Sequence, residues 1–357
     1  MLARDSLQYR TVSQMIDQFM TIDLTGVGLI SNLFKAQQQR QPGPMCMGAA
    51  ELVSERLSTK KGPVLIVTGF PEGGGVPETD GPVAAALLAR ALFLGFGVES
   101  VIAIDEDWVP MMQGTCLGAG LSPRPLPASG VIEPIAFLRP VYICGVPRDK
   151  TGCQRISDDL LEKTKPQLLF AVERPGANKN GVYHALGGRV LDGLVADLDE
   201  LVRKAKDRKI PFIAFADGGN EVGMGVIAED LPTFSPKARD CGCPCRGGIG
   251  AAIAADVLIV ASVSNWGVTG LIAALAALRQ NPIIFHEPEL EVRSIELCCA
   301  SGGVDGMIEA PEPGVDGIMS KEWEGLIRAL RGSVLRCLGM TVDWRGQMGD
   351  WRQLKKT

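Results

Sequence analysis

Aromatic residues are scarce in this chain of 357 residues. They make up 5% of the sequence, whereas hydrophobic residues make up 46% and glycine occupies 43 positions. We therefore expect an aliphatic core and many tight loops that approach their neighbours closely. This composition is typical of an α/β enzyme.

The sequence lacks a membrane-spanning run and a targeting segment. Arg, Asp or Gly interrupts its longest apolar stretches, residues 83–96 and 249–263, before they reach the roughly 20 residues that cross a bilayer. Residues 1–5 (MLARD) resemble neither the apolar core of a secretory signal nor an acid-poor transit peptide. We expect no membrane partner, and a cytoplasmic location, or the mitochondrial matrix in a eukaryote.

The sequence also lacks an excess of basic residues. It has 36 Lys and Arg against 41 Asp and Glu, for a net charge of -5, and no segment concentrates the basic residues. This pattern argues against nucleic acid as a partner. We expect a small-molecule substrate, and the sequence leaves assembly into a homo-oligomer open.

Histidine is rare in this chain, and its cysteines are not spaced as zinc ligands usually are. The chain has two histidines, His184 and His286, and its ten cysteines are typical of reduced, buried thiols. The one dense run, Cys241, Cys243 and Cys245, lacks a partner pair at the spacing of a zinc or iron–sulfur site. We expect local packing or free loop thiols there, with a metal or redox role as the less favoured alternative, and His184 as a packed loop residue.

Short aliphatic segments alternate with helical patterns along most of the chain. The expected strands are residues 64–67, 98–104, 141–144, 168–172, 212–216, 257–261 and 283–285. The expected helices are residues 13–20, 48–58, 83–96, 191–206, 269–278 and 320–338, with Asp80 and Ser320 as N-caps and Pro82 near the first position of the third helix.

This alternation predicts right-handed βαβ units. The expected fold class is α/β, with a doubly wound, mainly parallel sheet and helices on both faces in a Rossmann-like three-layer arrangement. We expect a helical N-terminal cap over residues 1–60, a catalytic domain over 61–345 and a polar tail over 346–357.

Carboxylates and amides collect where the expected strands end. The loops concerned are residues 68–81, the loop at Asp105, and residues 173–180, 217–221 and 264–267. We expect Glu173, Asp217 and Glu221 to face one crevice, where crowded carboxylates require protons or a cation. Because oxygen ligands abound and histidine is rare, Mn or Mg is favoured over zinc at this site.

The glycine-rich segment 68–82 does not match a nucleotide-binding loop. It contains neither GxGxxG nor GxxxxGK[ST], and its acidic residues Glu72, Glu78 and Asp80 would repel a pyrophosphate. Asp80 has two interpretations. As a cap alone it could be replaced by Asn without effect, whereas as a charged group of the site its replacement would lower turnover and leave folding intact.

Four motifs, in order along the chain, resemble the D-glutamate cyclase family. They are PETDGP (77–82), VERPGANKNGVYH (172–184), DGGNEVGMG (217–225) and SNWG (264–267), and the resemblance covers about residues 10–340. It implies conversion of D-glutamate to 5-oxo-D-proline and water, with manganese as the usual metal. The α-amine would attack the γ-carboxylate, a metal would polarise that group, and a carboxylate would accept the ammonium proton.

The expected site residues fall into three groups. The catalytic residues are Asp217, Glu221 and Asp80, and the metal ligands are Glu173, Asp217 and Glu221. The expected substrate contacts are Thr68, Thr79, Gly81, Asn178, Lys179, Asn220 and Asn265. Two alternatives stay open: another Mg- or Mn-dependent hydrolase of phosphate esters or amides, and a non-catalytic module that binds an amino acid or a nucleotide.

Overall fold

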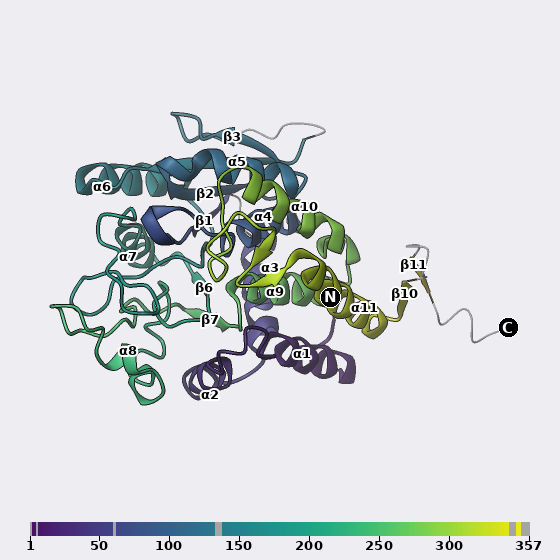
Figure 1. Cartoon of the computed structure of the whole chain (residues 1–357). Coiled ribbons are helices and arrows are strands. Elements are labelled where there is room, and N and C mark those ends of the chain that lie inside the picture. Colours follow the sequence, from purple (N-terminus) through teal and green to yellow (C-terminus); the bar gives the residue numbers. More distant parts are fainter. Residues whose placement is uncertain (1, 5, 60–61, 133–137, 343–347, 351–357) are drawn as a thin grey trace.

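The computed structural model describes residues 2–4, 6–59, 62–132, 138–342 and 348–350 (Figure 1). Its strands are β1 (Val64–Thr68), β2 (Ser100–Asp105), β3 (Ser122–Pro125), β4 (Pro140–Val146), β5 (Leu169–Val172), β6 (Phe212–Ala216), β7 (Val257–Val260), β8 (Gly314–Val315), β9 (Ile318–Met319), β10 (Met340–Val342) and β11 (Met348–Asp350). Its α-helices are α1 (Leu7–Met20), α2 (Ile30–Arg40), α3 (Met45–Thr59), α4 (Pro82–Phe96), α5 (Val109–Gly118), α6 (Lys150–Asp159), α7 (Asp199–Asp207), α8 (Pro236–Arg239), α9 (Ser264–Arg279), α10 (Pro288–Ala300) and α11 (Ser320–Cys337). Short helical turns are η1 (Gly73–Gly75), η2 (Glu106–Trp108), η3 (Leu160–Thr164), η4 (Leu231–Thr233) and η5 (Pro282–Ile284).

Seven strands form one parallel sheet in the order β3-β4-β2-β1-β5-β6-β7. The chain runs outward from β1 to β2 and the strands beyond it, then returns to β5, β6 and β7 on the other side of β1. The strand order therefore reverses between β1 and β5. Ligands of doubly wound folds bind beyond the carboxyl ends of the strands at such a reversal.

Helices cover both faces of this sheet. Helix α9 packs against α4, α3 and α1 on one face, and α6 packs against α7 on the other (Figure 1). Strands β1, β2, β5 and β6 are buried along their whole length, which is why their sequences are mainly hydrophobic and do not alternate with polar residues. These features confirm the predicted three-layer α/β fold. None of the described helices is long and apolar enough to span a bilayer.

Helix α9 lies at the centre of the core. It is buried from Ser264 to Leu278, as expected of a helix packed on all sides. Gly270 allows α1 to approach, because a Cβ there would lie 2.4 Å from the Sδ of Met20. Helices α1, α2 and α3 share this core with the sheet, and their division from it as a separate cap stays a prediction. The expected polar tail lies outside the described residues, apart from β11.

One predicted strand is wrong. Residues 283–285 begin within the turn η5, and Ile283 is 61% exposed. Pro282 has no N–H for strand pairing, and the side chain of Asn281 accepts a hydrogen bond from the N–H of Ile283. The short apolar run therefore belongs to a capped turn.

Several predicted helix starts are also wrong. Helix α1 begins at Leu7 and not at residue 13, and α9 begins at Ser264 and not at residue 269. The helix expected at residues 191–206 begins only at Asp199, because Gly193 adopts a φ of 78° and the residues before Asp199 form turns. Ser320 is the first helical residue of α11, and Met319 occupies the N-cap position. The sequence patterns did not indicate helices α2, α5, α6 and α10.

Candidate active site

A cavity of about 350 Å³ lies where the strand order reverses. Much of its wall comes from the loops that follow β1, β5, β6 and β7, because parallel strands bring their carboxyl ends to one edge. Eight carboxylates line it: Asp23, Glu72, Glu78, Asp80, Glu173, Asp217, Glu221 and Asp316. Arg189 is the one basic residue among the described lining residues. We call this space the acidic cavity.

The carboxylate of Asp80 caps a helix that is distant in the sequence. Its Oδ1 accepts hydrogen bonds from the N–H groups of Gly81 (2.9 Å) and Asn265 (2.7 Å). Its Oδ2 accepts one from the N–H of Ser264 (3.0 Å), the first residue of α9. The prediction that Asp80 is the N-cap of α4 is therefore wrong, because Gly81 holds that position.

Asn265 caps α4 in turn. Its Oδ1 accepts hydrogen bonds from the N–H groups of Gly81 (2.9 Å) and Ala84 (3.3 Å). Residues 264–267, expected as a loop, form the first turn of α9, whose free N–H groups Asp80 satisfies. The two helices beside the acidic cavity thus cap each other: Asp80, just before α4, caps α9, and Asn265, in the first turn of α9, caps α4.

Glu173 has an unusual backbone conformation directly after β5. Its φ of 40° lies in the left-handed region, which costs energy for a residue with a side chain and persists only where neighbours enforce it. The hydroxyl of Ser264 donates a hydrogen bond to its Oε2 (2.6 Å). Gly81 leaves space for it, since a Cβ on Gly81 would lie 2.9 Å from the Cβ of Glu173.

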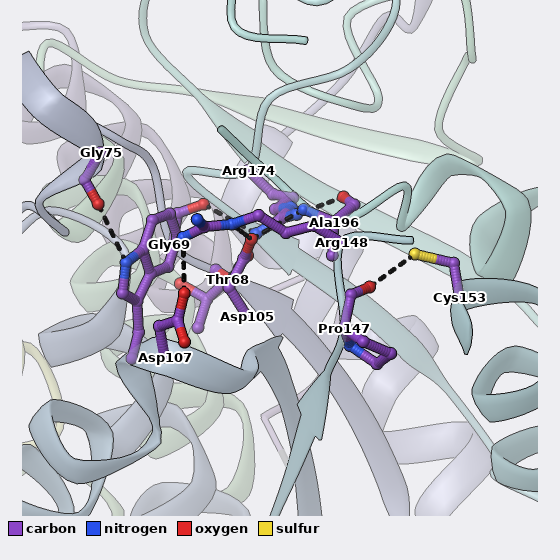
Figure 2. A network of polar contacts seen from close by, with 11 residues as sticks. Thr68, Gly69, Gly75, Asp105, Asp107, Pro147, Arg148, Cys153, Arg174 and Ala196 are labelled. Atoms are coloured by element: carbon purple, nitrogen blue, oxygen red, sulfur yellow. Dashed lines mark hydrogen bonds and ion pairs between the residues drawn. The ribbon is translucent and has the colours of Figure 1, made fainter. Parts of the chain in front are cut away.

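Arg174 holds the strand ends together behind the acidic cavity. Its guanidinium is buried, pairs with the carboxylate of Asp105 and donates to the backbone oxygens of Gly69 (3.1 Å) and Ala196 (2.5 Å) (Figure 2). Asp105 also accepts a hydrogen bond from the N–H of Ala196 (2.7 Å). The loop at Asp105 was expected at the ligand edge, but this carboxylate does not line the cavity and acts in the framework instead.

The side chain of Glu221 is bound by its own loop. Its carboxylate accepts hydrogen bonds from the N–H groups of Asp217 (3.2 Å), Gly218 (2.6 Å) and Gly219 (2.8 Å). Gly219 has a φ of 109°, which the turn requires and which suits glycine. Three of the lone-pair positions of Glu221 are therefore occupied, and its carboxylate is fixed in place.

Asp217 belongs to two groups of potential metal ligands. One oxygen from each of Glu173, Asp217 and Glu221 lies within 4.8 Å of the others. The same holds for Asp80, Asp217 and Asp316. Asp217 is itself held by the N–H of Ser264, which donates to its Oδ2 (3.0 Å). A cation in either position would therefore contact Asp217.

Burial and mutual repulsion raise the pKa values of these carboxyl groups. Burial raises the pKa of Glu173 well above its usual range, and the neighbouring Glu221 adds to the effect. Burial likewise raises the pKa of Asp217, Asp316 and Glu78, and that of Asp80 to about 7. No Lys or Arg of the described residues forms an ion pair with these five groups. The cluster therefore needs protons or a metal ion to be neutral.

The seven residues expected to contact substrate occupy different places. Asn220 lines the acidic cavity. Four of the others are buried outside the lining: Thr68, Thr79, Gly81 and Asn265. Asn178 is buried and donates a hydrogen bond to the backbone oxygen of Gly248 (2.6 Å), while Lys179 is exposed. The structure thus brings Asp80, Glu173, Asp217, Asn220 and Glu221 together and leaves the other six expected site residues outside the lining.

Several lining residues were missed by the sequence analysis. Glu78 lies two positions before Asp80, within the motif at residues 77–82, so its place could have been inferred. Asp316 comes from the turn between β8 and β9, and Arg189 from the irregular loop after β5. Neither belongs to a periodic element, and no signal in the sequence pointed to them.

Comparison with known proteins agrees with the motif resemblance. A human protein described as mitochondrial D-glutamate cyclase is 29% identical over 226 residues, which cover 60% of this chain and 33% of the human protein. The aligned part is thus about a third of that relative's length. The family described as D-glutamate cyclase-like, C-terminal, matches residues 16–331. Since this match spans the sheet and all the carboxylates of the acidic cavity, the chain belongs to the D-glutamate cyclase-like C-terminal family.

Proposed function

We propose that this protein converts D-glutamate to 5-oxo-D-proline and water with the help of a divalent cation, Mn or Mg. The observation that carries the proposal is the cluster of unpaired carboxylates around Asp217, in a chain that belongs to this family. A substrate with two carboxylates would be repelled from so acidic a cavity unless protons or a cation first neutralised the cavity's carboxylates.

The residues fit such a cation. Carboxylate oxygens are the ligands that Mg and Mn prefer, and the two groups that share Asp217 contain no histidine or cysteine. Glu173, Asp217 and Glu221 would hold one ion, and Asp80 and Asp316 offer a second position beside it. When bound, the cation would neutralise the cluster and polarise the γ-carboxylate of the substrate.

The substrate would be oriented by the polar groups that face the cavity. Arg189 would bind the α-carboxylate as the cationic lining group. Asn220 Oδ1 and Ser262 Oγ are buried, belong to lining residues and have no hydrogen-bond partner among the described residues, so they are available to the ammonium group. A cavity of about 350 Å³ suits a small amino acid curled into a ring.

Two proton transfers accompany ring closure. Asp217, one of the carboxylates that face the cavity, would accept a proton from the α-ammonium. The nitrogen then bonds to the γ-carbon and loses a second proton. The C–O bond breaks as the two protons taken from nitrogen reach the departing oxygen, which leaves as water, and Asp80, which is not in the group of Glu173, would relay them. Glu221 would position the loop, since three N–H groups already occupy its carboxylate.

The test is direct. The purified full chain would be incubated with D-glutamate or L-glutamate, with Mn, Mg or a chelator, and 5-oxoproline would be measured. We expect product from D-glutamate with metal, and none after chelation or in Asp217→Asn. Hydrolysis of p-nitrophenyl phosphate without 5-oxoproline would instead establish a hydrolase. Binding heat with no product would establish a ligand-binding module.

A further inference from the structure

A second cluster of metal-binding side chains lies apart from the acidic cavity. His184 belongs to the loop after β5, and Cys241, Cys243 and Cys245 belong to the loop after α8. One ligand atom from each lies within 4.8 Å of the others. The expectation of loop thiols and a packed histidine missed this grouping, because the spacing of the cysteines does not reveal a fourth ligand from a distant loop.

Four of the six distances within the cluster, at 3.3–3.8 Å, are close to those of a tetrahedral zinc site. The Sγ of Cys241 lies 3.4 Å from that of Cys243 and 3.5 Å from that of Cys245. The Nε2 of His184 lies 3.3 Å from the Sγ of Cys243 and 3.8 Å from the Sγ of Cys245. Tetrahedral bonds of about 2.3 Å to sulfur and about 2.0 Å to nitrogen place ligand atoms roughly 3.5–3.8 Å apart. The thiols are not joined as disulfides.

The surroundings orient these ligands as metal sites require. The Nδ1 of His184 lies 3.1 Å from the backbone oxygen of Val182, a contact that favours the proton on Nδ1 and leaves Nε2 free to coordinate. The Sγ of Cys245 receives hydrogen bonds from the side chain of Asn178 (3.4 Å) and the N–H of Gly247 (3.4 Å). Such N–H donors stabilise a thiolate.

We infer that His184, Cys241, Cys243 and Cys245 bind one structural zinc ion. Three sulfurs and one imidazole select a soft or borderline metal over Mg or Mn, and four protein ligands leave no position open for a substrate. The site is thus distinct in ligand chemistry from the carboxylates around Asp217, and it goes beyond the proposed function.

The ion would brace one wall of the acidic cavity. Leu186 and Arg189, shortly after His184 in the chain, line that cavity. The side chain of Asn220 donates a hydrogen bond to the backbone oxygen of His184 (3.1 Å). Zinc would therefore tie the two loops together and fix the position of Arg189. Any effect on D-glutamate turnover rests on the proposed function, but zinc binding itself does not.

The experiment measures metal content of the full chain, purified without chelators, by plasma mass spectrometry. We expect about one zinc per chain in the wild-type protein and at least a tenfold lower content in Cys243→Ser and Cys245→Ser. Two matched controls should keep their zinc. Cys337→Ser removes a cysteine outside the cluster, and Asp217→Asn removes a carboxylate of the acidic cavity.

Cobalt binding keeps the inference testable if the cysteine variants do not fold. Wild-type protein stripped of zinc and given Co²⁺ should show the intense visible bands of tetrahedral cobalt thiolate, and added zinc should abolish them. Wild-type protein that neither contains zinc nor takes up cobalt with these bands would overturn the inference. So would zinc that stays in folded Cys243→Ser, or that disappears in Asp217→Asn.

Discussion

Replacement of Asp80 separates its hydrogen bonds from its charge. In Asp80→Asn, the amide oxygen can take the place of Oδ1 and keep the bonds from Gly81 and Asn265. The N–H of Ser264 loses Oδ2 but retains Asp217 as an acceptor at 3.0 Å. The new NH₂ group faces the N–H of Ser264, but the neighbouring carboxylate of Asp217 can accept hydrogen bonds from both, so no buried N–H is left without a partner. We therefore expect the free energy of unfolding to change by less than about 1 kcal/mol.

Asp80→Ala provides the contrast. The N–H of Gly81 keeps its bond to the side chain of Asn265, and the N–H of Ser264 keeps Asp217, so the N–H of Asn265 alone is left without an acceptor. One buried unsatisfied donor costs about 1–3 kcal/mol. Urea unfolding should therefore rank wild type and Asp80→Asn together, with Asp80→Ala clearly below them.

Turnover should follow a different order. Both variants lose a carboxylate from the group that includes Asp217 and Asp316, so both should lose at least tenfold in kcat, or about 1.4 kcal/mol in barrier. The assay is 5-oxoproline formation from D-glutamate with Mn, on protein whose folding is verified by circular dichroism. Wild-type turnover in folded Asp80→Asn would show that Asp80 is only a helix cap. Equal stability of Asp80→Asn and Asp80→Ala would refute the argument that the Ala variant leaves the N–H of Asn265 without an acceptor.

Three further changes test other parts of the site. Glu221→Gln turns an NH₂ group toward one N–H of its loop, such as that of Gly218, so urea unfolding should show a loss of about 1–3 kcal/mol; an unchanged midpoint would contradict this. Arg189→Ala should raise the KM for D-glutamate about tenfold, or ~1.4 kcal/mol, with kcat nearly unchanged. Arg208 is similarly exposed, so Arg208→Ala serves as the control. An equal KM in the two variants would exclude the proposed contact between Arg189 and the substrate. Gly81→Ala places a Cβ 2.7 Å from the Oγ1 of Thr68, at a residue whose φ is 89°. The free energy of unfolding should therefore fall by more than about 1 kcal/mol. A thermal unfolding midpoint equal to that of the wild type would show that the backbone relaxes around the new side chain.

The sheet could be predicted from the sequence because its strands are buried on both faces. Such strands are short hydrophobic runs, and the run at residues 212–216 matches β6 at both ends. Their parallel arrangement then implies that the carboxylates after β5 and β6 meet at one edge, as Glu173 and Asp217 do. The run at residues 283–285 has the hydrophobic pattern of a strand. Only Pro282, which has no N–H to pair with a neighbouring strand, argues against that assignment.

Contacts between distant segments could not be predicted in the same way. The amides that Asp80 caps belong to residues 264 and 265, and local propensity would assign its side chain to the nearest helix. Asp316 and Arg189 come from loops whose path depends on the packing beneath them, and hydrophobic periodicity carries no information on that path. His184 joins three cysteines for the same reason, through a fold that brings two loops together.

The excess of carboxylates in the acidic cavity bears on the order in which metal and substrate would bind. With eight carboxylates and one arginine among its described lining residues, the cavity repels anions unless protons or cations neutralise its carboxylates. On the proposed function, an anionic substrate would gain access once protons or cations have neutralised the cluster. Where metal rather than protons neutralises the cluster, metal would bind first and substrate second, and the apparent affinity for substrate would rise with the free concentration of the metal. By this means the protein would respond to metal supply without a separate regulatory site.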